Sequence, residues 1–319
     1  MKIGIRSLSI AQRSKRQNEP AGRRRYKGTT FPSASRKGRD RHSPPSRPRD
    51  PLASGGDLLA GGGKSKELGS TEGSLKDSIK NTLKNPDVRS FALICVTACV
   101  SLLVLQFAGD DANYAHFFPP VRFRPDPYWV LRTRAWWVFW ILISYVAIPV
   151  IVMACTPGKP LRDCNLSFRG FRQHFWIYVA LFVLVAPVIW IVSLSPQFYS
   201  YYPMYAQAGR SWRDLLMWEG MYAGQFVALE FFFRGFLVGR LSRYIGVLAV
   251  PVSVMPYMMI HFTKPWPEAT GAIVAGLILG WLALKLKSIW GGVCVHCAVA
   301  VSMDLLALSH KGQLPWLHN

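Results

Sequence analysis

Residues 216–238 read LMWEGMYAGQFVALEFFFRGFLV, an apolar run that carries a carboxylate at Glu230 and a guanidinium at Arg234. A run of this length and composition can cross a lipid bilayer as one helix. Near the bilayer centre each charge costs on the order of 2.5–3.5 kcal/mol, so ionisable groups kept there generally mark a functional site. The i, i+4 spacing puts both side chains on one helical face, where they can pair. A purely structural ion pair is the alternative interpretation.

Further apolar runs of similar length precede and follow this one. The seven runs lie roughly at residues 90–108, 135–155, 174–194, 216–238, 246–262, 269–285 and 289–308. Tryptophans such as Trp136, Trp218 and Trp290 fall near the ends of these runs, which is typical of the aromatic belts at membrane–water interfaces. We therefore predict an all-α fold, a polytopic membrane helix bundle of about seven transmembrane helices over residues 90–310, surrounded by membrane lipids.

The start of the chain has a different composition. Residues 1–90 hold 21 of the 38 Lys and Arg but only 8 of the 17 Asp and Glu. Because this segment has too few apolar side chains for a core, we predict a disordered basic tail over residues 1–89, with a short interfacial helix at residues 75–83. We expect the tail to contact anionic lipid headgroups, and no specific nucleic acid. We expect a multi-pass location in a bacterial cell (inner) membrane, although the Arg- and Ser-rich start also fits an organellar transit peptide.

Two histidines in the later runs match Glu230 in height. The fourth and fifth runs are joined by a short turn near Gly246, so they are expected to be antiparallel neighbours. Glu230 lies 16 residues before Gly246 and His261 lies 15 residues after it, which places both about 23 Å from the turn at 1.5 Å per residue. His296 lies roughly two turns into the last run and can reach the same depth. One carboxylate and two imidazoles are thus predicted to meet on three helices.

Three chemistries use this set of groups. Glu230 beside a histidine can take a proton from water and return it to a leaving amine, while the second histidine stabilises an oxyanion. Glu230, His261 and His296 are also a ligand set for a catalytic zinc with an open fourth position, and otherwise we expect no cofactor. Both of these schemes are hydrolytic. A proton relay through a transporter uses the same residue types.

Three short segments carry motifs in a fixed order: LEFFFRG at 229–235, YMMIH at 257–261 and HCAVA at 296–300. They resemble the pattern EExxxR with a following Gly, an aromatic-xxxH and Hxxx(Asn or Asp) of the CAAX-protease and bacteriocin-processing family (CPBP, also called Abi). The resemblance covers residues 216–308. It implies a glutamic-type intramembrane endopeptidase that hydrolyses a peptide bond in a membrane-associated protein or peptide.

The resemblance also implies roles for the four candidate site residues. In the family, the first Glu and the histidine of the second motif activate water, and the histidine and Asn of the third motif bind the oxyanion. We therefore expect Glu230 to act as general base, with His261 as its partner on the water and His296 as the oxyanion donor. Arg234 is expected to keep Glu230 ionised.

Two positions depart from the family pattern. Leu229 stands where the first Glu would be, and Ala300 stands where the final Asn would be. Our interpretation assigns the base to Glu230, which lies one residue further along and about 100° around the helix. The alternative is a catalytically inactive homologue that acts as a binding or immunity protein in the membrane.

Overall fold

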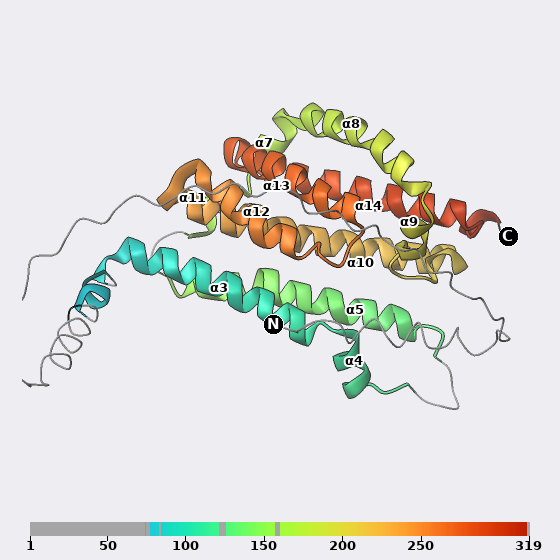
Figure 1. Ribbon diagram of the computed structural model, residues 1–319, viewed down its shortest axis with the longest axis horizontal. Helices are drawn as coiled ribbons and strands as arrows, with labels where there is room; N and C mark the ends of the chain where they lie inside the picture. Colours follow the sequence, from blue (N-terminus) through green and yellow to red (C-terminus); the bar gives the residue numbers. More distant parts are fainter. Residues whose placement is uncertain (1–73, 75–76, 83, 121–125, 157–159, 318–319) are drawn as a thin grey trace, which may run out of the picture. The chain divides into compact units, whose positions relative to one another are not determined.

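The structure is a computed structural model that describes residues 74, 77–82, 84–120, 126–156 and 160–317. Within these residues the regular elements are helices (Figure 1). Two stretches, Ile143–Ala147 and Phe231–Val238, are π-helical. The α-helices are α3 (Pro86–Ala108), α4 (Asp111–Phe117), α5 (Trp129–Leu142), α6 (Ile148–Ala154), α7 (Phe168–Gln173), α8 (Phe175–Ser193), α9 (Pro196–Tyr201), α10 (Trp212–Glu230), α11 (Gly239–Ile245), α12 (Ala249–Met259), α13 (Trp266–Leu286) and α14 (Trp290–His310).

Six helical stretches of the described chain are long and apolar enough to cross a membrane, which confirms the all-α polytopic bundle. One of them, Trp212–Met259, contains the fourth predicted run and most of the fifth. Its helical segments follow one another directly, and the chain reverses at Gly246, which has φ +58°. Glycine adopts this conformation without steric cost. Six stretches therefore appear where about seven helices were predicted.

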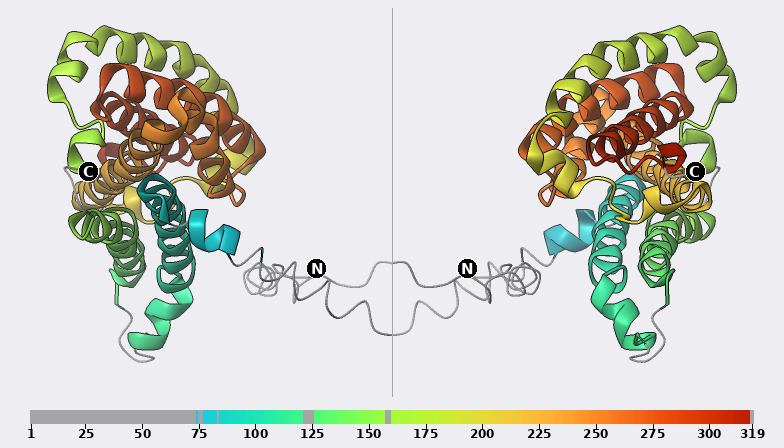
Figure 2. Two further views of the ribbon diagram at one scale, coloured as in Figure 1. Left: turned by 90° about the vertical axis from the view of Figure 1, so that its left-hand side faces the viewer. Right: turned by 90° about the vertical axis from the view of Figure 1, so that its right-hand side faces the viewer.

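Helix α8 lies on the outer side of the bundle and packs against α14 (Figure 2). Its residues Leu184 and Ile191 are 72% and 67% exposed. Apolar side chains presented this widely on a soluble protein would be a liability. On a membrane helix the same side chains contact lipid acyl chains, in agreement with the predicted multi-pass membrane protein.

The predicted tail is described only near its end. Residues 77–82 are helical, within the interfacial helix predicted at 75–83. The first membrane helix begins at Pro86, so residues 86–89 belong to α3 and not to the tail. Asn85 sets this start, because its side chain accepts a hydrogen bond from the backbone N–H of Asp87. Residues 1–73, and with them most of the predicted disordered tail, lie outside the described residues.

The π-helix Phe231–Val238 follows α10 without a break and begins directly after Glu230. Wider i→i+5 turns are rare and occur frequently at functional sites. Side chains from other segments bond the carbonyls of this one. Ser253 Oγ donates to the carbonyl of Phe233 at 3.1 Å, and Asn165 Nδ2 donates to the carbonyl of Arg234 at 2.9 Å. The wide turn is thus fixed by contacts with α12 and with the loop before α7.

That loop packs closely against α11. A Cβ added at Gly239 would lie 2.2 Å from the carbonyl oxygen of Asp163, so only glycine allows this approach. The Asp163 carboxylate also pairs with Arg240 and Arg243, each at 2.9 Å. The helical segment that follows Glu230 is therefore held by α12 and by the loop before α7.

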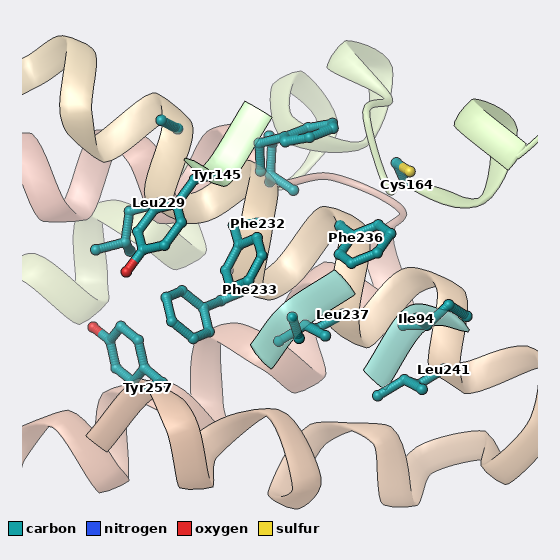
Figure 3. Packing of buried hydrophobic residues seen from close by; sticks show 14 of the residues in the cluster. Ile94, Tyr145, Cys164, Leu229, Phe232, Phe233, Phe236, Leu237, Leu241 and Tyr257 are labelled. Carbon is teal, nitrogen blue, oxygen red and sulfur yellow. The ribbon is translucent and has the colours of Figure 1, made fainter. Parts of the chain in front are cut away.

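The core around the π-helix is aromatic (Figure 3). Tyr145 stacks on Phe232 with ring centroids 4.5 Å apart and meets Phe233 edge-on at 5.7 Å. On its other side Phe233 meets Tyr257 of α12 edge-on at 5.2 Å. These contacts hold α12 against the π-helix. They also place Tyr257 next to the π-helical segment that follows Glu230 in the sequence.

Candidate active site

Glu230 is the last residue of α10 and has no exposed surface. Its Oε1 atom lies 3.2 Å from Nη1 of Arg234 and 2.9 Å from Nδ1 of His296. The structure thus brings three of the four predicted site residues together. Arg234 is contributed by the π-helix, and His296 by α14.

Gly292 on α14 makes room for the carboxylate. A Cβ added there would lie 2.3 Å from Oε2 of Glu230. The backbone of α14 therefore touches the acid directly, one turn before His296. The Nδ1 atom of His296 also bonds the carbonyl oxygen of Gly292 at 3.1 Å. The ring of His296 stacks on Phe226 with centroids 5.3 Å apart, so its plane is fixed as well.

Tyr257 is a member of this cluster that the sequence did not single out. Its hydroxyl lies 2.9 Å from Nε2 of His296. The guanidinium of Arg234 lies over its ring, 4.0 Å from the centroid, in a cation–π arrangement. The sequence feature that could have indicated Tyr257 is the aromatic position of the second motif, YMMIH, because a tyrosine at that position carries a hydrogen-bonding hydroxyl.

His261 lies beside the cluster, in the turn after α12. Its Nδ1 bonds the carbonyl of Tyr257 at 2.8 Å, and its ring meets the Tyr257 ring edge-on at 4.8 Å. Because a carbonyl can only accept, Nδ1 carries the proton and Nε2 holds a lone pair. Burial lowers the pKa of His261 to about 4, so the ring is neutral at neutral pH.

Among the residues that the structure describes, Glu230 forms ion pairs with Arg234 and His296 but not with His261. The sequence had predicted that Glu230 and His261 lie at the same depth and meet. The height estimate assumed a uniform rise of 1.5 Å per residue. Residues 231–238 are π-helical and Gly246–Leu248 form a 3-10 turn, which rises about 2.0 Å per residue. Residue 261 also lies beyond the end of α12 at Met259. Tyr257, one turn earlier, reaches the cluster in its place.

The Glu230–Arg234 pair has short contacts but poor alignment. Within the described residues, neither Glu230 oxygen and neither terminal nitrogen of Arg234 makes a hydrogen bond of ordinary geometry. Buried polar groups are nearly always hydrogen-bonded. The pair therefore has donor and acceptor capacity that the ion-pair contact alone does not use.

The described residues contain no group of three or more His, Cys, Asp or Glu side chains arranged to hold a metal ion. The zinc alternative stays a prediction.

The two positions that depart from the family pattern face apolar packing. Leu229 is 7% exposed and belongs to the same buried cluster as Tyr145 (Figure 3). Ala300 is 5% exposed and belongs to a cluster that includes Trp218 and Phe226. Neither position presents a polar atom to the cluster around Glu230.

A family model, Rce1-like, described as type II CAAX prenyl endopeptidase Rce1-like, matches residues 210–302. The matched segment contains every residue of the cluster around Glu230. It confirms the resemblance over this part of the chain. The chain has no match among curated proteins or among solved structures.

Proposed function

We propose that the chain is an intramembrane glutamic-type endopeptidase that hydrolyses a peptide bond in a membrane-associated protein or peptide. The observation that carries this proposal is the contact of 2.9 Å between Glu230 and His296 inside a membrane bundle. The match to a CAAX endopeptidase family supports a peptide hydrolase at the level of the family.

Glu230 acts as the general base in this scheme. It takes a proton from water as the water oxygen attacks the carbonyl carbon. Arg234, 3.2 Å away, favours the ionised form of the carboxylate, and the neutral Nε2 of His261 accepts a hydrogen bond that orients the water. The C–O bond forms and the carbonyl oxygen becomes an oxyanion.

His296 completes the reaction as the partner of Glu230. The Nδ1–H of His296 faces the carboxylate at 2.9 Å, so Glu230 keeps the proton that it takes from water. His296 donates to the oxyanion, as expected for its motif, and Glu230 returns the proton to the amine as the C–N bond breaks. Water is consumed, and one carboxylate product and one amine product form.

A cleavage assay tests the proposal. The full chain is reconstituted in phosphatidylcholine vesicles with a fluorogenic peptide that ends in a prenylated CAAX sequence, and products are identified by mass spectrometry. We expect cleavage by the wild type and a loss of at least about 10²-fold in Glu230→Gln. Glu219→Gln is the matched control, because Glu219 lies on the same helix about 16 Å away. Equal cleavage by Glu230→Gln would overturn the proposal.

A non-catalytic binding protein of the same fold is the second candidate. The apolar surroundings of Leu229 and Ala300 favour it, since the acid and amide of the family pattern are both missing there. This candidate predicts that the wild type binds the prenylated peptide without cleaving it. It also predicts that Glu230→Gln and His261→Ala leave that binding unchanged.

A further inference from the structure

Tyr257 is the residue through which the two histidines of the site are connected. Its hydroxyl contacts His296, and its backbone carbonyl accepts from His261. Its ring lies under the guanidinium of Arg234 and packs against Phe233. The side chain is 2% exposed, so these contacts hold it in one orientation.

The contacts of His296 define its tautomer. Nδ1 donates to the carbonyl of Gly292, which can only accept, so the proton of the neutral ring is on Nδ1. Nε2 then carries a lone pair, and the hydroxyl of Tyr257 donates to it. His261 has the same tautomer for the same reason, because its Nδ1 donates to the carbonyl of Tyr257.

The side chain of Ala300 cannot make a hydrogen bond to His296. Ala300 follows His296 by one helical turn, the place where the family pattern has a side chain able to hydrogen-bond. Its methyl group packs instead in the apolar cluster with Trp218 and Phe226. The polar contact at the second ring nitrogen of His296 therefore comes from another helix.

We propose that Tyr257 is the positioning residue of this site: its hydroxyl orients the His296 ring, and its carbonyl orients the His261 ring, in place of a polar group at residue 300. The proposal rests on the proposed function for its effect on rate. The ring orientation itself stands on the hydrogen bonds alone. Tyr257 need not touch the substrate in this role.

Tyr257→Phe removes the hydroxyl and keeps the ring. Tyr205→Phe is the matched control, because it removes a buried hydroxyl that donates to Asp214 at 2.7 Å, away from the site. The first measurement is the 15N spectrum of histidine-labelled full chain in detergent, with the His296 signals assigned by their loss in His296→Gln. The second is cleavage of the prenylated CAAX peptide in vesicles.

We expect Tyr257→Phe to move the Nε2 resonance of His296 and to lower kcat by about 10²-fold, with KM changed less than about twofold. Tyr205→Phe should leave both unchanged. An unmoved resonance, or a kcat equal to that of the wild type, overturns the proposal. If the wild type itself fails to cleave, the proposed function fails, and the resonance alone decides whether Tyr257 orients the ring.

Discussion

The carboxylate of Glu230 lies against the backbone of Gly292, so closely that a Cβ added at Gly292 would sit 2.3 Å from Oε2. No pair of non-bonded heavy atoms is stable at that separation. Any side chain at position 292 must therefore push Glu230 or α14 away. The contact between the acid and His296 depends on a glycine that contributes no functional group of its own.

Gly292→Ala should consequently abolish most of the activity while the bundle remains folded. A displacement of about 1 Å at a reacting group can cost about 10²-fold in rate, and we expect a loss of that order. The measurement is cleavage of the prenylated peptide beside the helical content in detergent. Gly224→Ala is the control, because an added Cβ there meets nothing within 4 Å. Equal losses in the two variants would show that the effect is not specific to Glu230.

Arg234→Met should lower the stability of the protein. It leaves the buried carboxylate of Glu230 without its cation, and breaking a buried pair on one side costs about 3–5 kcal/mol. The measurement is the unfolding midpoint in detergent. Arg132→Met serves for comparison, because the Arg132 side chain is 60% exposed and its ion pair with Asp126 should contribute about 0–1 kcal/mol. Similar midpoints for both variants would contradict a tightly buried pair at Glu230.

His261 should titrate well below an ordinary histidine. Burial lowers its pKa to about 4, so the folded protein binds this proton less readily than the unfolded chain, whose pKa is about 6.5. Its contribution to stability is complete above about pH 6.5 and is lost as the pH falls toward 4. A 15N titration of the ring tests this, and His261→Gln should remove that part of the pH dependence of stability. A midpoint near 6.5 would mean that the ring is exposed to water.

Metal content separates the acid–base scheme from the zinc alternative. Because the described residues contain no group of three or more His, Cys, Asp or Glu side chains placed to hold a metal ion, we expect the purified chain to carry less than one zinc per molecule and to keep its activity in a chelator. Elemental analysis of the wild type provides the measurement. One zinc per chain, lost in both Glu230→Gln and His261→Ala, would establish the metal site instead.

Hydropathy and spacing predicted the membrane bundle because the bilayer imposes length and composition on each helix. They also placed Glu230, Arg234 and His296 correctly relative to one another. The i, i+4 spacing determines that Glu230 and Arg234 share a helical face, and an estimate of depth in the bilayer is sufficient to place His296 near them. Glu230 and His296 are on regular α-helix, where a constant rise per residue holds, and Arg234 lies only one turn beyond Glu230.

The π-helix and the place of His261 could not be predicted in the same way. A π-turn depends on whether outside groups, here Ser253 and Asn165, satisfy its carbonyls, and no local pattern encodes that. The position of His261 then shifts with the altered rise before it. Tyr257 was missed because an aromatic residue on an apolar helix is ordinarily core packing, and only its hydroxyl contact with His296 distinguishes it.

In the proposed mechanism Glu230 and His296 act as one unit, and a double-mutant cycle on cleavage tests this coupling most directly. Residues that act together show strongly non-additive losses. We predict that Glu230→Gln combined with His296→Gln cleaves the prenylated peptide about as slowly as the slower single variant. Losses that multiply in the double variant, or cleavage retained in either single variant, would contradict the account.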